Sequence, residues 1–329
     1  MDALSELLRV IRLSGTAFID ADLYAPWAVE TPPPTAIAAR LAPSAGRIIP
    51  YHLVTEGACH VKLTAQPPIE LAAGQVIMFP HGDVHVLAST LGLKPLQITT
   101  DAVVKLTRPD SIAKIRYGGN GAHTRLICGF FACDEVLSEQ LLARLPRLMH
   151  CKIGADRGAA LLSRSAQPSG EAAQLGLGAV LGKLSELLFV DAIRAYVESM
   201  SPHEGWLNGL KDRYVSRGLA LMYGRPGDHW TVESLARTVG VSRTVLADHF
   251  VRCTGMAPMQ YLSQWRLRVA ADGLRHTDRA IKLIAEAAGF GSVATFARAF
   301  RREFGVSPDR WRRNQRNGER PDPQGRSGL

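Results

Sequence analysis

The sequence predicts an α+β protein of two domains, the first rich in strands and the second all helical. Its 329 residues exceed what one small core needs. Short alternating apolar runs fill roughly residues 15–107, whereas helical spacing dominates from Glu135 onward. The basic excess is confined to the last third of the chain. We therefore expect domains at residues 1–203 and 204–314, followed by a disordered polar tail at 315–329.

The first domain should begin with a short amphipathic helix, because Leu4, Leu7, Leu8 and Ile11 share one helical face. Strand-like runs follow, separated by turn-forming clusters such as TPPPT and AAG. These runs are TAFI, CHVKL, QVIMF, HVLA and LQITT. Their even spacing predicts a sandwich or barrel.

A helical stripe closes the first domain. Apolar residues recur at spacings of three, four and seven, which is typical of a helix that packs against another helix. The partner can belong to the same domain or to a second chain, and the pattern leaves both open. The stripe consists of Leu177, Leu181, Leu184, Leu188 and Ala195. A hinge is expected at Pro202–Gly205.

Charge separates the two domains. Up to His203 the chain has 18 Lys and Arg against 18 Asp and Glu, and from Glu204 it has 21 against 12. A localised basic excess favours a polyanionic partner, with nucleic acid first and an acidic membrane surface second. The chain has no apolar run of transmembrane length and no signal-peptide pattern, so a cytoplasmic location is expected. Five irregularly spaced cysteines fit reduced thiols.

The second domain contains one unit twice. Ala236, Gly240 and Val241 recur 49 residues later as Ala285, Gly289 and Phe290. The alanine allows two helices to cross closely, the glycine accepts the left-handed conformation that ends the first helix, and the apolar residue fills the corner. Ser242 and Ser292 are then placed to cap the second helices. The pattern predicts two helix-turn-helix motifs, and residues from Pro258 to about His276 predict a rigid helix between them.

Residues 208–313 resemble the DNA-binding domain of AraC/XylS transcription regulators. The stretches WTVESLARTVGVSRTVLADHF and IKLIAEAAGFGSVATFARAFRREFGVSPDRWRR carry the resemblance. In that family the two recognition helices enter successive major-groove segments about 34 Å apart. The resemblance implies double-stranded promoter DNA as the partner, and RNA polymerase as a second partner if the protein is an activator.

The position of each residue in the motif indicates its role on DNA. We expect the outward faces to read bases through Arg243, Thr244, Ala247 and Asp248 in the first recognition helix, and Val293, Ala294, Ala297 and Arg298 in the second. Arg298 is the strongest candidate, because a guanidinium can grip a guanine edge with two hydrogen bonds. Asp248 departs from the family's usual basic or amide residue, so the first helix should read sequence weakly. Backbone phosphates should be held by Ser242, Arg252, Ser292, Arg301 and Arg302.

The first domain resembles the cupin-type sensor of many AraC-like regulators, which implies a cupin-like β-barrel with flanking helices. Gly74-x5-Pro80-x-Gly82-x2-His85 follows the second cupin motif, and Gly46-x5-His52-x-Val54 half follows the first. Valine replaces the second metal-binding histidine. We therefore expect a polar effector pocket more than a metal centre, with candidates His52, Glu56, His81 and His85.

The leading hypothesis is a sequence-specific transcription regulator, acting as a homodimer, that senses a small effector through its first domain and is not an enzyme. It needs no cofactor, although a metal in the cupin domain stays possible. One alternative is a metal-dependent cupin enzyme fused to a DNA-targeting domain. Another is a thiol redox switch through Cys128 and Cys133, which lie five residues apart in an apolar surround.

Overall fold

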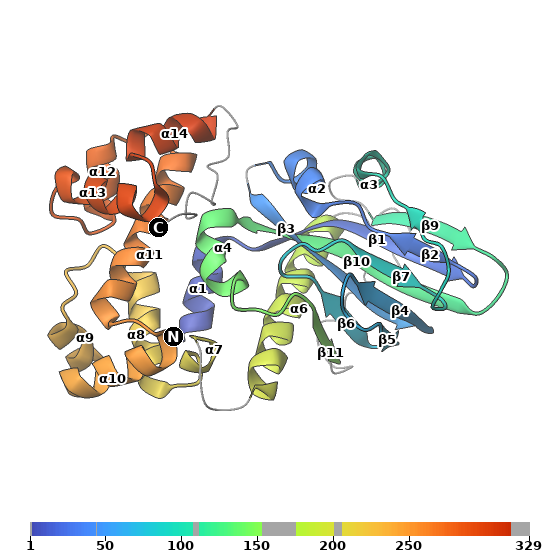
Figure 1. Ribbon diagram of the computed structural model, residues 1–329, viewed down its shortest axis with the longest axis horizontal. Helices are drawn as coiled ribbons and strands as arrows, with labels where there is room; N and C mark the ends of the chain where they lie inside the picture. The colour runs from blue at the N-terminus through green and yellow to red at the C-terminus, as the bar shows by residue number, and fades with distance from the viewer. Residues whose placement is uncertain (1, 44, 108–111, 153–175, 201–205, 317–329) are drawn as a thin grey trace. The chain divides into compact units, whose positions relative to one another are not determined.

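The computed structural model describes residues 2–43, 45–107, 112–152, 176–200 and 206–316 (Figure 1). The chain forms two compact units: a C-terminal unit made of Met1–Ile11 with Ser201–Leu329, and an N-terminal unit, Arg12–Met200. The predicted hinge lies outside the described residues, as does the predicted tail apart from residues 315 and 316, which belong to a helix. Within the described ranges, no helix combines the length and apolar character that a bilayer crossing requires.

The N-terminal unit contains two β-sheets (Figure 1). The six-stranded sheet has the order β11-β6-β3-β10-β1-β9, and the five-stranded sheet has the order β5-β4-β7-β2-β8. Neighbouring strands run antiparallel except for the pairs β1–β9 and β2–β8. The strands are β1 (Ser14–Tyr24), β2 (Ala28–Glu30), β3 (Gly46–Glu56), β4 (Ala58–Leu63), β5 (Ile69–Ala72), β6 (Gln75–Met78), β7 (His85–Ala88), β8 (Leu96–Gln97), β9 (Ile112–Gly118), β10 (His123–Asp134) and β11 (Met149–Lys152).

The core of this unit lies between the sheets, because each strand directs alternate side chains inward. Buried Leu23 and Leu126 of the six-stranded sheet meet buried Val61 and Leu87 of the five-stranded sheet in one cluster. The strand pattern therefore gives two packed sheets, as the sequence predicted for a sandwich or barrel, with one central apolar layer.

Helix α6 (Leu177–Ser199) packs on the outer face of the six-stranded sheet. The hydroxyls of Ser185 and Tyr51 are 2.8 Å apart, and the rings of Phe189 and Phe131 are 5.2 Å apart. The predicted stripe residues Leu181, Leu184 and Leu188 are buried, so they serve the core of their own unit, one of the two alternatives that the sequence left open. The other helices in the described part of this unit are α2 (Pro34–Leu41), α3 (Thr100–Leu106) and α4 (Glu135–Leu142).

The C-terminal unit is helical, as the sequence predicted. Its aromatic core joins Tyr223, Phe250, Tyr261 and Trp265, all fully or almost fully buried. The helices are α1 (Ala3–Ile11), α7 (Trp206–Gly209), α8 (Arg213–Gly224), α9 (Val232–Val239), α10 (Arg243–Thr254), α11 (Pro258–His276), α12 (Ile281–Ala287), α13 (Val293–Phe304) and α14 (Pro308–Arg316).

The N-terminal helix α1 differs from the expected domain division. Its position in the sequence places it in the domain at residues 1–203, but it packs against α8 and belongs to the C-terminal unit. Its apolar face, with Leu7 and Ile11 fully buried, finds its partner there. Glu6 is also buried and lies so close to Gly224 that a Cβ there would be 3.1 Å from the Glu6 carboxylate. Amphipathicity correctly predicted the helix but could not identify the surface that covers it.

Candidate nucleic-acid interface and the interior of the N-terminal unit

The first motif is α9, a turn and α10. A reciprocal pair of hydrogen bonds between Thr231 and Ser234 caps the start of α9. Gly240 ends α9 with a φ of 91°, a left-handed conformation that favours glycine. The Val241 N–H then donates to the Ala236 carbonyl over 3.0 Å, which closes the turn.

The second motif, α12 and α13, repeats this geometry. Gly289 has a φ of 83°, and the Phe290 N–H donates to the Ala285 carbonyl over 2.9 Å. Ser292 caps α13 by accepting from the Thr295 N–H, as Ser242 caps α10 by accepting from Val245. The prediction of two equivalent helix-turn-helix motifs is confirmed down to these hydrogen bonds.

The predicted base-reading residues lie on matching faces of α10 and α13. In α10, Leu246 and Phe250 are buried, and in α13 Phe296 and Phe300 occupy the equivalent positions. The opposite faces are open to solvent: Arg243, Thr244, Asp248, Val293, Ala294 and Arg298 are exposed, while Ala247 and Ala297 are half-buried. Arg243 is engaged by Glu233 at 3.2 Å, whereas Arg298 has no ion pair within the described residues.

Two outward-facing residues escaped the sequence analysis. Val245 is 38% exposed in the first turn of α10, and Thr295 is exposed at the equivalent place in α13. The two are 50 residues apart, like the capping residues Ser242 and Ser292. The repeat itself was therefore the signal that could have identified them.

The arginines predicted to contact phosphates differ in whether they form ion pairs within the protein. Arg301 and Arg302 are exposed on α13, and neither forms an ion pair with any residue that the structure describes. Arg252 instead contacts Asp212 at 3.2 Å, and His249 contacts the same carboxylate at 2.6 Å. Asp212 caps α8, so Arg252 is partly committed to holding α10 against α8. Sequence spacing gave no sign of this partner.

Nothing in the sequence indicated a contact, here called the joint, between the second motif and the loop that enters the first. Arg266, midway along α11, donates to the Pro226 carbonyl over 2.7 Å and to the Asp228 carbonyl over 2.6 Å. These carbonyls belong to the loop that leads into α9. The same guanidinium lies against Gly289 of the second motif, where a Cβ would approach it to 2.8 Å. One side chain thus contacts the second motif and the loop that enters the first.

The loop backbone itself completes this joint. A Cβ on Gly227 would lie 2.6 Å from the Ala287 carbonyl at the end of α12, so the loop packs directly on the second motif. Burial lowers the pKa of Arg266, with the nearby Asp228 charge opposing this. The relative position of the motifs is therefore set both by α11 and by this contact.

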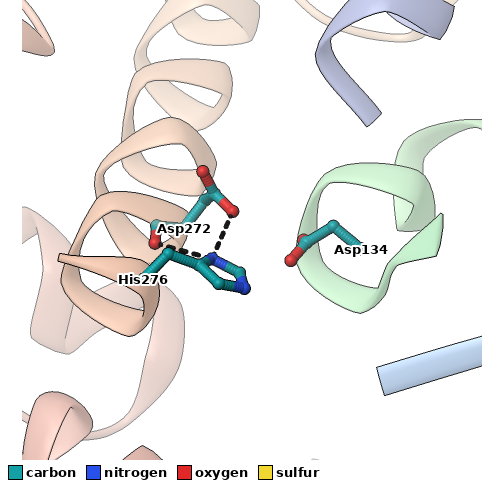
Figure 2. A group of neighbouring side chains, drawn as sticks. All are labelled: Asp134, Asp272 and His276. Atoms are coloured by element: carbon teal, nitrogen blue, oxygen red, sulfur yellow. Dashed lines mark hydrogen bonds and ion pairs between the residues drawn. The ribbon is translucent and has the colours of Figure 1, made fainter. Parts of the chain in front are cut away.

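The end of α11 carries a histidine and an aspartate in contact. His276, in the last turn, lies 2.8 Å from the carboxylate of Asp272 one turn earlier (Figure 2). A histidine there suits the negative end of the helix dipole. Figure 2 also labels Asp134, which in the N-terminal unit caps α4 by accepting from the N–H groups of Val136 and Leu137.

In the N-terminal unit, two of the four predicted effector residues meet. The Nε2 atoms of His52 and His85 are 2.7 Å apart, and His52 Nδ1 is 2.9 Å from the sulfur of Cys128. His85 Nδ1 must donate to the Asp83 carbonyl at 2.8 Å, since a carbonyl only accepts. His85 Nε2 then accepts from His52, whose Nδ1 accepts from the Cys128 thiol. The three side chains form one neutral hydrogen-bonded chain.

Burial supports the neutral state. Both histidines are buried, and burial lowers the pKa of His85 to about 4 and that of His52 well below its usual value. Burial likewise raises the pKa of Cys128 above its ordinary range. A charge on any member would be poorly solvated there.

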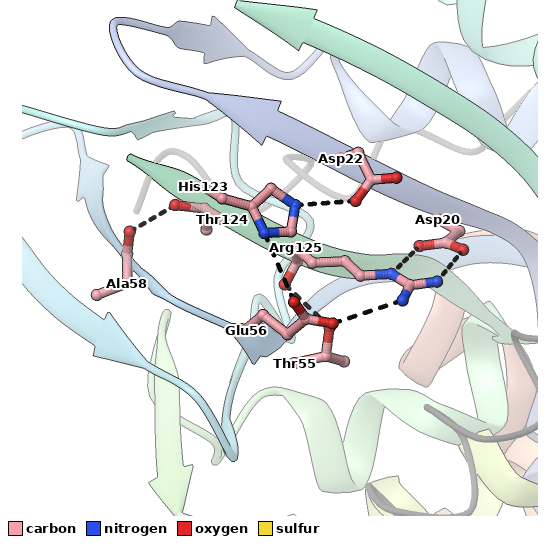
Figure 3. A network of polar contacts seen from close by, with 8 residues as sticks. All are labelled: Asp20, Asp22, Thr55, Glu56, Ala58, His123, Thr124 and Arg125. Carbon is pink, nitrogen blue, oxygen red and sulfur yellow. Dashed lines mark hydrogen bonds and ion pairs between the residues drawn. The ribbon is translucent and has the colours of Figure 1, made fainter. Parts of the chain in front are cut away.

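The other two predicted effector residues lie elsewhere. Glu56 contacts Arg125 and His123 in a surface network, where Arg125 also donates two hydrogen bonds to buried Asp20 (Figure 3). His81 is exposed and donates to the Leu145 carbonyl over 2.9 Å. Of the four predicted residues, only His52 and His85 contact each other within the described residues, while Glu56 and His81 are engaged by other partners.

These donors do not fit a cupin metal centre. Val54, at the position of a family ligand, is a fully buried core residue, and Glu56 is committed to Arg125. Two imidazoles bound about 2.1 Å from one cation at ordinary angles would also hold their nitrogens about 3 Å or more apart. The observed 2.7 Å is a hydrogen-bond distance. The chemistry of the site therefore needs no metal.

The predicted redox cysteines do not face each other. Cys128 packs against the core between the sheets, whereas Cys133, five residues along the same strand, is on the other side of the sheet. Five strand residues span about 17 Å, far more than a disulfide allows. Burial raises the pKa of Cys133 to about 11, so neither thiol is activated.

A helical unit with two motifs that expose equivalent recognition faces defines a DNA-binding helix-turn-helix protein. Matches to known protein families support this class of protein. Residues 2–198 match the Cupin family and residues 235–314 match the Helix-turn-helix domain family. The chain belongs to the AraC-type transcriptional regulators that carry an N-terminal cupin domain.

Several relatives match this chain over nearly their whole length. A Streptomyces lividans protein described as an AraC-like transcription regulator is 29% identical over 333 residues, which cover 95% of this chain and 99% of the relative. The HTH-type transcriptional regulator AlkR of Acinetobacter baylyi is 25% identical over 325 residues, covering 95% and 99%. Among solved structures, the DNA-binding domain of AdpA in complex with a target DNA is 29% identical over 35% of this chain and 99% of that chain, with a TM-score of 0.31.

Proposed function

We propose that this regulator binds promoter DNA through both motifs at once and that its N-terminal unit makes binding or transcription respond to a small effector. The observation that carries the proposal is the pair of equivalent exposed faces on α10 and α13, held by one helix and one backbone joint. A fixed pair of helices suits two major-groove segments about one DNA turn apart.

Arg298 reads a base in this proposal, because it is exposed and unpaired within the described residues. Thr244, Ala247, Val293, Ala294 and Ala297 supply shape and methyl contacts, with Val245 and Thr295 beside them. Arg243 and Asp248 complete the first face. Arg301, Arg302 and the capping serines Ser242 and Ser292 hold phosphates, and Arg252 contributes less because Asp212 already engages it.

Regulation follows from two units in one chain. An effector bound by the N-terminal unit shifts the regulator between states only if it binds one state more tightly than the other. Homodimers form through the solvent-facing side of α6, where Val180 is 49% and Leu187 is 54% exposed. The protein acts in the cytoplasm, contacts RNA polymerase at activated promoters, and works as a regulator and not as an enzyme.

Genome-wide binding-site mapping with the full chain, followed by footprinting on the recovered duplexes, tests the proposal. Two protected major-groove segments on one face of the DNA are expected, about one helical turn apart. Protection of a single groove, or unchanged sequence preference when the outward faces of α10 and α13 are both replaced, contradicts it. Light scattering of the wild type and of Leu187→Glu tests the dimer, and the wild type should have the mass of a dimer that the variant loses. A monomeric mass for the wild type, with and without DNA, contradicts the dimer and leaves the DNA-binding proposal intact.

A further inference from the structure

A cavity of about 430 Å³ opens on the outer face of the five-stranded sheet. On β4, Cys59, Val61 and Leu63 point into the core, so His60 and Lys62 between them point outward. The segment from Thr90 to Pro95 borders the cavity beyond the end of β7. Its size is in the lower part of the range of about 300 to 1,000 Å³ typical of small-molecule sites.

Strand register builds the floor and two walls of this groove. Lys62 on β4 pairs with Val86 on β7, which pairs with Glu30 on β2. In the next row, His60 pairs with Ala88. Because adjacent strands are about 4.8 Å apart, Lys62 and Glu30 stand about 10 Å apart across a small apolar floor. One wall is therefore cationic and polar, and the other is anionic.

The polar groups of the first wall are available to a ligand. Lys62 is exposed and forms no ion pair with any described residue. His60 Nδ1 is occluded without a hydrogen-bond partner in the described part of the chain. A bare ring nitrogen there costs less than an orphaned N–H, which places the proton on Nε2 and makes Nε2–H the donor that His60 can offer. An ammonium and an imidazole N–H side by side suit a carboxylate.

We propose that this groove binds a small organic monoanion, and, on the basis of the effector response proposed above, that it is the effector site of the N-terminal unit. The carboxylate lies at Lys62 and His60. The apolar body rests on Val86 and Ala88, beside Leu91 and Leu93. Glu30 at the far wall disfavours a second anionic group, so dicarboxylates are rejected.

Hexanoate, hexanamide and adipate test the charge rule on one carbon skeleton. The thermal unfolding of the full chain is measured with each compound. Hexanoate should raise the Tm of the N-terminal unit by about 3 to 6 °C at a tenfold excess over its Kd. Hexanamide lacks the anionic group, and adipate adds a second one, so both should shift the Tm less. The proposal is overturned if hexanoate gives no shift at the highest concentration tested, or if all three compounds act alike.

Variants locate the site. Lys62→Met should remove the preference for hexanoate over hexanamide, and Val86→Trp should fill the floor and remove both responses. Lys114→Met, an exposed strand lysine on β9 of the other sheet, should respond like the wild type. A hexanoate response that survives Lys62→Met undiminished places the ligand elsewhere and overturns the groove assignment.

A parallel DNA-binding assay separates this proposal from the one it rests on. Lys62→Met should bind the mapped duplexes with wild-type affinity in the absence of acid. If the wild type protects two major-groove segments of the DNA but its Tm does not change with hexanoate, the ligand-site proposal fails and the DNA-binding proposal stands. If the wild type binds hexanoate on the five-stranded sheet but protects no duplex, the DNA-binding proposal fails and the ligand-site proposal stands.

Discussion

The two turn glycines form a matched pair that tests the joint between the motifs. Gly240 and Gly289 both adopt a left-handed conformation, with φ of 91° and 83°. A Cβ on Gly240 would meet nothing within 4 Å, whereas a Cβ on Gly289 would lie 2.8 Å from the Arg266 guanidinium. Gly240→Ala therefore reports backbone strain alone, and Gly289→Ala reports strain plus the displacement of Arg266.

The expected costs follow from these contacts. An L-residue in the left-handed region loses about 1 to 2 kcal/mol, which is the whole expected effect of Gly240→Ala on unfolding free energy. In Gly289→Ala, Arg266 can move aside only by giving up its two carbonyl contacts. Water partly replaces those contacts because the side chain is half-buried, so we expect about 1 kcal/mol more. Arg266→Ala alone should cost about 1 to 2 kcal/mol.

Denaturant unfolding of the full chain, followed by tryptophan fluorescence, provides the assay. Four of the five tryptophans, Trp206, Trp230, Trp265 and Trp311, lie in the C-terminal unit, so the signal reports mainly on that unit. The double variant Gly289→Ala with Arg266→Ala should lose about 1 kcal/mol less unfolding free energy than the sum of the losses in the two single variants. Equal costs for the two glycine variants, together with strict additivity in the double variant, would refute the joint.

Four further expectations concern the same two units. Arg298→Ala should weaken binding by about 1 to 3 kcal/mol and relax preference at one base pair, measured by competition with singly substituted duplexes, whereas the exposed α8 control Arg217→Ala should do neither. Arg301→Gln and Arg302→Gln should each reduce the salt slope of log K by about one, with a smaller change for Arg252→Gln because Asp212 already pairs with it; equal slopes for all three would contradict the assignment. Stability of the N-terminal unit should fall as pH drops from about 6.5 toward 4, by up to about 1.4 kcal/mol per pH unit for each histidine, because the unfolded chain takes up protons that buried His52 and His85 resist; thermal melts should show this slope flattened in His85→Gln. Leu7→Ala should destabilise the C-terminal unit by about 2 to 5 kcal/mol and leave the N-terminal unit unchanged, and the opposite distribution would place α1 with the sheets.

The sequence predicted what depends on local repetition. Gly240 and Gly289 require a left-handed turn, and Ser242 and Ser292 supply a cap, so each motif could be derived from a few adjacent residues. The alternating runs likewise predicted strands with one buried face, because alternation is a local property. The exposed faces of α10 and α13 then follow from helical geometry.

Contacts between distant residues could not be derived in the same way. Arg266 reads as one more surface arginine until the loop carbonyls 40 and 38 residues upstream are known to accept from it. Glu56 reads as a neighbour of His52 in an effector pocket because it is near His52 in sequence, but a register shift at the strand end pairs it with Arg125. Charge type was visible in both cases, and the partner was not.

His52 and His85 do not fit a cupin metal centre, but they form a buried hydrogen-bonded pair in the N-terminal unit. A cupin metal centre needs at least three converging donors, and Val54 removes one of them at a position where a buried apolar side chain completes the core. His52 and His85 then satisfy each other, with Cys128 and the Asp83 carbonyl closing the two ends of the chain. A closed neutral chain has little to offer an anionic ligand, because every polar atom in it is already paired. Lys62 and His60, whose polar groups have no partner within the described residues, lie on the outer face of the five-stranded sheet. We therefore expect ligand recognition on that face and not at the histidine pair.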